Sequence, residues 1–459
     1  IDGCYSISFV IFSNLYSKCW VLYSNLTRRE GDNLRGETKP IVDIKYQYFW
    51  NMLGTISSTA VSIVLLLIVS RLTSPSIADS FSIAFTLGQQ FLVIGLFGVR
   101  NFQATDVNES YSFSAYFISR VMSILLMLVS LMLYMNATGF TNEKYWIIVF
   151  MVLYRACDAI SDVYQGEFQQ KQRSDLAGKV LFYRSLSTIV VFILVLLVTG
   201  NLLVATISLF LTNLILSYFL DIRYYQLNFS RSSFKINSSW QGSLNILKLC
   251  LSLFISSFII NYIFNLPKII IDSFITVGQL GEGLQRDFNI LFMPTFVLNL
   301  LLMLLRPMLT EISIFLHNGQ ISAYNRQVKK IFGALIGLHL LVLVGGYLLG
   351  IPILSFIFGV NLSPYLLSFI ILLVGAGFNV YSVMIDNVLT IHRKQYYLLF
   401  STILAFIFSS AITKVLISKF AILGASISFT LTMLVYFMSS LLVYHIVNRK
   451  IVKMEINIK

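Results

Sequence analysis

The 459-residue sequence is 57% hydrophobic and only 12% charged, whereas charged residues make up about a quarter of an average soluble protein. The formal net charge is +13, but the basic residues stand in short segments between apolar runs, which argues against a nucleic-acid partner. The four cysteines and four histidines are dispersed, so we expect no disulfide framework and no metal site. A GxxxxGK[ST] motif is absent, and no nucleotide or other cofactor is expected.

Apolar stretches of about 20 residues recur along the chain, each long enough to cross a hydrocarbon core of roughly 30 Å as a helix. Strand-type alternation is absent, which argues against a barrel. The predicted fold class is therefore all-α integral membrane, with about 12 transmembrane helices. In chain order they are expected at residues 50–70, 77–97, 114–136, 145–164, 180–199, 202–221, 246–266, 288–309, 331–350, 363–385, 397–417 and 422–445.

The polar segment between the sixth and seventh of these helices divides the chain into two halves of six spans. An even number of spans gives both halves the same topology, as in transporters built from parallel repeats. The expected parts are an extension over 1–45, a first six-helix lobe over 46–222, a cytoplasmic linker over 223–245, a second lobe over 246–446 and a basic tail over 447–459. We interpret the extension as disordered or mis-annotated, with a poor additional span as the alternative.

Basic residues are distributed unequally between the two sets of loops. If the segment before the first helix is cytoplasmic, the inner loops and the tail carry most of the lysines and arginines, and the outer loops carry few. Because Lys and Arg accumulate on the cytoplasmic side of membrane proteins, we expect both ends of the helix bundle in the cytoplasm. In this assignment Arg100 and Arg184 belong to inner loops, and Arg71, Lys144, Lys268 and Arg286 to outer loops.

Five segments resemble the polysaccharide-exporting flippases of the multidrug/oligosaccharidyl-lipid/polysaccharide superfamily, and most closely the capsule and O-antigen repeat-unit flippases. The segments are FWNMLGTISSTAVSIVLLLIVSRL (49–72), VRNFQATDVNESYSFSAYFISR (99–120), YRACDAISDVYQGEFQQKQRSDLAGK (154–179), NLPKIIID (265–272) and LRPMLTEIS (305–313). One departure lies in the first outer loop, where Thr73, Ser74 and Pro75 stand in place of the glycine-rich turn common in the family.

This resemblance implies two six-helix lobes around a central cavity, working by alternating access in a bacterial cytoplasmic membrane. The implied cargo is an undecaprenyl-pyrophosphate-linked oligosaccharide, moved to the outer leaflet for capsule, O-antigen or exopolysaccharide assembly. Membrane lipid and other polysaccharide-assembly proteins are the implied partners. A transporter, not an enzyme, is expected.

Charged residues inside the predicted spans are the candidate cargo-binding residues, because each costs about 2.5 to 3.5 kcal/mol at the centre of a span. Arg155 lies about 16 Å from the outer end of the fourth helix, and Asp158 and Asp162 share its helical face. One interpretation is an Arg155–Asp158 ion pair that holds the lobes together. The other is a set of cavity-lining groups that contact cargo or a coupling cation.

Further candidates are less deeply placed. Arg120 either lines the cavity or extends its charge to the inner interface. Lys268 and Arg306 are expected as interfacial anchors near helix ends, although both fall in family motifs, and Asp386 and Asp272 are placed similarly. His339 is expected to form a hydrogen bond between helices, with proton relay as the alternative. The spacings of Gly333 with Gly337 and of Gly346 with Gly350 favour close helix contacts.

A cationic cavity suits a pyrophosphate headgroup, because guanidinium groups form forked hydrogen bonds to phosphate. An inside-negative membrane potential favours outward movement of anions by about 2.3 kcal/mol per charge per 100 mV. The expected energy source is therefore this potential or a cation gradient. On this interpretation Arg155 contacts the cargo.

Two other classes of protein compete with the flippase. A cation-coupled multidrug exporter of the same superfamily needs acidic groups in the cavity, and only Asp158 and Asp162 are well placed. A membrane-embedded polysaccharide polymerase or ligase needs a large outer loop with catalytic motifs, and the outer loops are short. A lipid II flippase of the peptidoglycan pathway would carry a chemically similar cargo. Only the family resemblance separates it from a capsule flippase.

Overall fold

A computed structural model of the chain describes residues 44–106, 109–140, 142–228, 236–296, 298, 306–317, 319–391 and 396–456. These residues form helices joined by short turns, with no strand among them. The all-α fold class predicted from the apolar stretches is thereby confirmed. The expected extension over 1–45 lies outside the described residues, apart from the first two residues of α2.

The first half of the chain forms helices close to those predicted. They are α2 (Ile44–Leu72), α3 (Pro75–Leu96), α4 (Val99–Thr105), α5 (Phe113–Ala137), α6 (Asn142–Gln170), α7 (Ser174–Thr199), α8 (Leu202–Leu216), the π-helical η1 (Ser217–Ile222) and α9 (Arg223–Asn228). In the turn between α2 and α3, the Ser74 hydroxyl caps α3 and Pro75 is its first residue, a combination that favours helix initiation.

The second half begins with the longest unbroken helix, α10 (Ile236–Thr276). It continues with α11 (Leu284–Phe292), η2 (Met293–Phe296), α13 (Arg306–His317), α14 (Ile321–Gly345), η3 (Gly346–Gly350), α15 (Ile351–Phe358), η4 (Ser363–Tyr365), α16 (Leu366–Ile391) and α17 (Tyr396–Ile456). Within α17 the chain turns at Ala421, which has φ 46°. A Cβ on Gly424 would lie 2.0 Å from the Leu416 carbonyl oxygen, so α17 contains two helices that meet at this turn.

Nine helices in the described part of the chain are long and apolar enough to cross a membrane. The predicted count of about 12 stays a prediction. The number nine counts α17 as one span, from Leu399 to Asn448, where two helices were predicted. A second difference is that α6 carries several charged residues, and the predicted helix over 288–309 crosses residues outside the described ranges.

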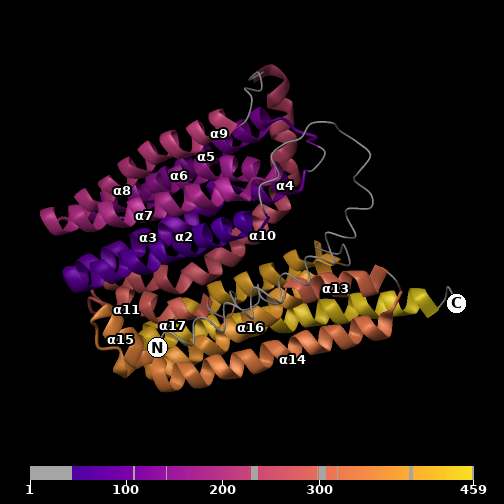
Figure 1. The fold of residues 1–459 in the computed structure, drawn as a ribbon. Coiled ribbons are helices and arrows are strands. Elements are labelled where there is room, and N and C mark those ends of the chain that lie inside the picture. Colours follow the sequence, from indigo (N-terminus) through magenta and orange to yellow (C-terminus); the bar gives the residue numbers. More distant parts are fainter. Residues whose placement is uncertain are drawn as a thin grey trace.

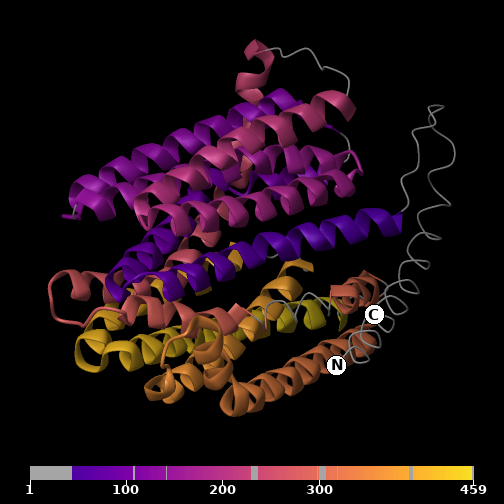
Figure 2. The same ribbon diagram turned by 60° about the vertical axis from the view of Figure 1, so that its left-hand side comes forward.

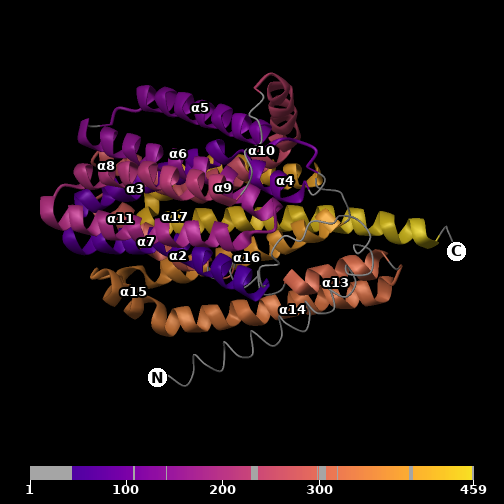
Figure 3. The same ribbon diagram turned by 45° about the horizontal axis from the view of Figure 1, so that its top comes forward.

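The helices gather in two groups, with α2 to α9 in one and α11 to α17 in the other, and α10 between them (Figure 1). Figure 2 shows the same two groups from another side, and in Figure 3 the long axes of the helices run broadly along one direction. We call the end that carries α11 and α15 the outer end, following the orientation predicted from the basic residues. The groups approach each other at this end and separate toward α9 and α13 (Figure 1).

Glycines allow some helices to approach backbone to backbone. A Cβ on Gly54 of α2 would lie 2.3 Å from the Gly178 carbonyl oxygen of α7, so this crossing requires glycine. Gly346 and Gly350 pack against Phe369 and Leu373 of α16, as their spacing predicts. The same prediction is wrong for Gly333 and Gly337, because nothing lies within 4 Å of a Cβ built at either position.

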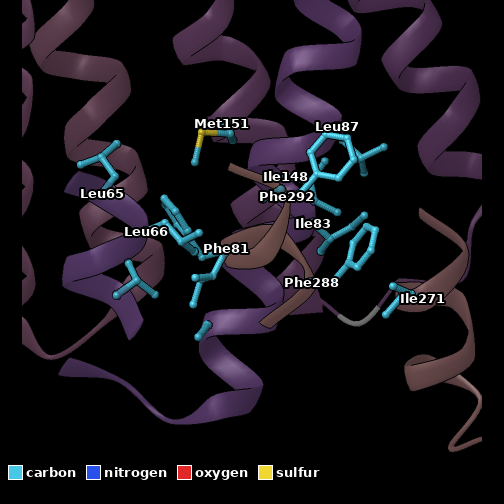
Figure 4. Close-up of a cluster of buried hydrophobic side chains, with 14 of the residues drawn as sticks. Leu65, Leu66, Phe81, Ile83, Leu87, Ile148, Met151, Ile271, Phe288 and Phe292 are labelled. Carbon is cyan, nitrogen blue, oxygen red and sulfur yellow. The ribbon is translucent and has the colours of Figure 1, made fainter. Parts of the chain in front are cut away.

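A continuous apolar core joins the two groups near the outer end. Figure 4 shows Phe81, Ile83 and Leu87 of α3 close to Phe288 and Phe292 of α11. The side chains of Phe288 and Phe292 are 0% and 1% exposed. Burial of this apolar surface stabilises contact between the groups at the outer end.

Candidate functional site

The central candidate, Arg155, lies inside the first half of the protein. Its Nη1 donates a 2.7 Å hydrogen bond to Asp158, and its guanidinium lies 4.8 Å from the ring centres of Phe85 and Tyr154. These aromatic faces offset part of the cost of burying the cation. The expected Arg155–Asp158 pair therefore forms, with Arg155 9% exposed and Asp158 25% exposed.

That pair does not hold the lobes together, which corrects the first interpretation. Asp158 accepts a second, 2.8 Å hydrogen bond from Arg184 of α7, which also donates to Asn213 of α8 at 2.7 Å. Arg184 lies 3.7 Å from Asp221 of η1, and Asp221 is fully buried. All of these residues belong to the first half, so the network connects α6, α7, α8 and η1 within one group of helices.

Asp162 is part of a second ionic cluster rather than a partner of Arg155. It accepts hydrogen bonds from Arg120 of α5 at 2.6 Å and from Arg100 of α4 at 3.0 Å. Arg120 also donates to the carbonyl oxygens of Gly95 and Leu96, so its positive charge stabilises the C-terminal end of α3. The Arg120 side chain is 1% exposed. The interfacial position predicted for Arg120 is therefore wrong, and its predicted place in the cavity lining stays a prediction.

Most of the charge in these two clusters is compensated. Together they hold four arginines and three aspartates, Arg100, Arg120, Arg155, Arg184, Asp158, Asp162 and Asp221, which leaves one net positive charge. Buried ion pairs keep their stability only while every member has a partner. The arginines predicted to bind cargo are thus already occupied by carboxylates of the protein.

Lys268 on α10 has a different environment. It is 9% exposed, and its Nζ lies 4.4 Å from the ring centre of Phe292. Within the described ranges, no carboxylate lies within 4 Å of this ammonium group. The prediction of an interfacial anchor is corrected, because Lys268 is buried against α11. Its carboxylate neighbour in sequence, Asp272, pairs with Lys144 of α6 at 2.6 Å.

Among the described residues, the Lys144–Asp272 pair is one of several polar contacts that cross between the halves at the outer end. Asp79 of α3 accepts hydrogen bonds from the backbone N–H groups of Gly283 and Arg286, at 2.5 and 2.8 Å. A carboxylate in this position stabilises the N-terminus of α11. Arg71 at the end of α2 donates to the carbonyl oxygens of Phe356 and Ile357 at the end of α15. Sequence analysis missed these contacts because each joins distant segments.

The second half contains fewer candidate groups. His339 of α14 contacts the Tyr381 hydroxyl at 2.8 Å and the Leu373 carbonyl oxygen at 3.1 Å, which confirms the predicted hydrogen bond between helices. Asp386 is half-buried and accepts a hydrogen bond from Tyr436. Arg306 begins α13, and its side chain lies outside the described residues.

Metal centres and pockets are two further kinds of site that the described residues could form. In the part of the chain that the structure describes, no three His, Cys, Asp or Glu side chains lie close enough together to hold a metal ion. A pocket of about 340 Å³ lies at the outer ends of α16 and α17, lined by residues such as Tyr365 and Phe420. This pocket is remote from Arg155, and it gives no support for a cargo site there.

The fold is shared with solved membrane transporters. An inward-facing multidrug resistance MATE family transporter of the MOP superfamily matches with a TM-score of 0.64 and 14% identity, covering 87% of this chain and 96% of that one. An outward-facing one matches with a TM-score of 0.60 and 15% identity, covering 89% and 96%. A MOP superfamily transporter from Pyrococcus furiosus, described as having a binding pocket of reverse polarity, matches at 0.57 and 14%, covering 88% and 94%.

No family model matches the sequence, and no curated protein matches it. At 13 to 15% identity, the structural similarity defines the fold and leaves the function open. Together with the nine candidate spans, it identifies an all-helical, multi-pass membrane protein with the fold of MOP superfamily transporters.

Proposed function

We propose that this protein is a membrane transporter that works by alternating access between two helical groups. The observation that carries the proposal is the similarity, over 87 to 89% of the chain, to both an inward-facing and an outward-facing transporter. The higher TM-score belongs to the inward-facing form. The contacts of Arg71, Asp79 and Lys144 at the outer end agree with it, because they close the side that an outward-facing state opens.

For the cargo, multidrug export is the first candidate. Solved transporters with this fold are named as multidrug resistance MATE proteins, so the comparisons favour this alternative over the flippase expected from the local motifs. Asp158 and Asp162, the acidic residues that a cationic drug would need, keep 25% and 13% exposure. Each is already hydrogen-bonded to two arginines, which weakens its attraction for a cation.

Movement of a lipid-linked oligosaccharide is the second candidate, and Lys268 favours it. This buried ammonium group has an aromatic neighbour, and no carboxylate of the described residues lies within 4 Å of it. It is therefore available to an anion, and lysine binds phosphate as a point charge. The net positive charge of the two arginine clusters would also attract an anionic headgroup. One similar transporter is described as having a pocket of reverse polarity and a different function, which supports a fold that tolerates more than one cargo.

One experiment with two cargoes separates these candidates. Purified protein in liposomes is given either a pyrophosphate-linked oligosaccharide lipid or a cationic dye, with and without an imposed potential. Multidrug export predicts dye movement above that of protein-free liposomes and no movement of the oligosaccharide headgroup. Flippase activity predicts headgroup movement above protein-free liposomes, and loss of that movement in Lys268→Met but less in Lys268→Arg. If neither cargo moves under any gradient, the transporter proposal fails.

A further inference from the structure

We propose that Asp272 exchanges its lysine partner when the outer end opens, leaving Lys144 of the first half and pairing with Lys268 of its own helix. The proposal rests on alternating access but not on either cargo. In this exchange α10 acts as a switch, because opening of the outer end would bring the Asp272 carboxylate to the buried ammonium group of Lys268 and compensate its charge.

The first part of the argument is the position of the observed ion pair. Lys144 lies at the outer end of α6, and Asp272 lies in the last turns of α10. Their charged atoms are 2.6 and 2.9 Å apart, with Lys144 13% and Asp272 4% exposed. Any movement that separates α6 from α10 at the outer end breaks this pair. Asp272 would then be a buried carboxylate without a cation, which is costly.

The second part is the spacing of Lys268 and Asp272 on α10. Residues four apart on a helix lie on the same face, within reach of each other's side chains. In the closed arrangement Asp272 faces Lys144, and Lys268 instead packs its ammonium group over Phe292. The switch therefore requires only rotation of two side chains on one helix, with no change in the backbone of α10.

The third part is that Phe292 itself lies at the boundary between the halves. It belongs to α11, which contacts α3 through Asp79, and it is one of the core side chains near Phe81 and Ile83 in Figure 4. The Phe292 ring also packs on Phe264 of α10 and Phe429 of α17, so these contacts hold it beside Lys268 when α3 and α11 separate. Asp272 then loses its partner, and Lys268, four residues away on the same helix, can replace Lys144.

The test measures the population of the open outer end without cargo. Spin labels are placed at Gly139→Cys and Gly281→Cys, two exposed outer-loop positions where a Cβ meets nothing within 4 Å, after the four native cysteines are replaced by alanine. Lys144→Met removes the closed-state partner, and the longer inter-label distance should gain population. Absence of this shift would overturn the exchange.

Lys268→Met added to Lys144→Met should return the distribution toward the short distance, by on the order of tenfold in the population ratio, because Asp272 then lacks a partner in both states. Lys268→Arg in the same background should keep the long distance. If Lys144→Met and the double variant are equally open, the exchange is wrong while alternating access stands.

Asp272→Asn provides the matched control. In a Lys144→Met background that also carries Asp272→Asn, adding Lys268→Met should have no further effect, since the carboxylate that links the two lysines is gone. An equal return to the short distance in this background would overturn the exchange, because Lys268 would then act independently of Asp272. A single short distance in all variants would overturn both the exchange and the alternating-access proposal.

Discussion

The interiors of the two helical groups differ in how they keep polar side chains buried. The first half uses charge, with arginines from α4, α5, α6 and α7 held by three aspartates. Apart from the Arg286–Asp287 pair of α11, the described interior of the second half relies mainly on hydrogen bonds with an uncharged partner, as between His339 and Tyr381 or between the Asp386 carboxyl and the Tyr436 hydroxyl. Similar helical architecture is therefore stabilised in two chemically different ways.

Because of this difference, we expect the two halves to differ in how much stability they lose when a polar side chain is replaced. A buried charge that loses its partner costs several kcal/mol, whereas loss of one neutral hydrogen bond costs about 1 kcal/mol. The first half should therefore be sensitive to single charge removals, and the second half should absorb comparable changes. Lys268, on the helix between them, belongs to neither pattern.

The largest expected effect follows from the sequence-based prediction that Arg155 contacts the cargo: Arg155→Ala should lose measurable transport, with the protein still present in the membrane. The fold should survive because Asp158 keeps Arg184 as a partner at 2.8 Å. Arg155→Lys should retain part of the activity, since the charge remains but the fork is lost. Transport in proteoliposomes and the amount of protein in the membrane are measured together. Normal transport by Arg155→Ala would remove Arg155 from the candidate site.

Arg184→Met should have the largest effect on stability, lowering the free energy of unfolding by about 3 to 5 kcal/mol. The substitution leaves Asp221, which is fully buried, without its only cation within 4 Å among the described residues. Denaturant unfolding in detergent micelles measures the change. The matched variant Arg184→Lys, which keeps the charge, should lose less. Equal stability of Arg184→Met and the unmodified protein would contradict the ionic account of the first half.

Asp162→Asn should lower the free energy of unfolding by about 1.5 to 3 kcal/mol, the range for hydrogen bonds to charged groups. Arg120 would keep its contacts to the Gly95 and Leu96 carbonyl oxygens, which limits the loss. The same unfolding experiment measures it. Asp162→Glu is the control that preserves charge, and a greater loss in this variant than in Asp162→Asn would show that shape, not charge, dominates the site.

Tyr381→Phe should have the smallest effect, about 0.5 to 1.5 kcal/mol. It removes the hydroxyl that contacts His339 at 2.8 Å. The other ring nitrogen of His339, Nε2, keeps its contact with the Leu373 carbonyl oxygen. The comparison between the halves predicts a smaller loss here than in Asp162→Asn. The reverse order of stabilities would break that comparison.

Helix positions were predictable because apolar runs of spanning length carry their own signal. Partners of charged residues were not, since Arg184 and Asp158 are 26 residues apart and Lys144 and Asp272 are 128 apart. Misplaced helix boundaries also contributed. Because α7 was expected to begin at residue 180, Arg184 lay near its expected start and was assigned to an inner loop. The helix in fact begins at Ser174, which places Arg184 about 15 Å inside it.

A glycine pattern illustrates the same limit. Gly346 and Gly350 meet α16, while Gly333 and Gly337 on α14 meet nothing, although the two spacings are identical. Spacing identifies a helix face that permits close approach, but only the tertiary arrangement decides whether a partner helix lies on that face.

Alternating access is tested most directly by locking the outer end. Lys144→Cys and Asp272→Cys replace an ion pair whose charged atoms lie 2.6 Å apart, and a short thiol-specific cross-linker with a reducible spacer then ties α6 to α10 in proteoliposomes. The proposed mechanism predicts that cross-linked protein stops moving its cargo and that reduction restores movement to the level of the same variant before cross-linking. Undiminished transport by the fully cross-linked protein would contradict it.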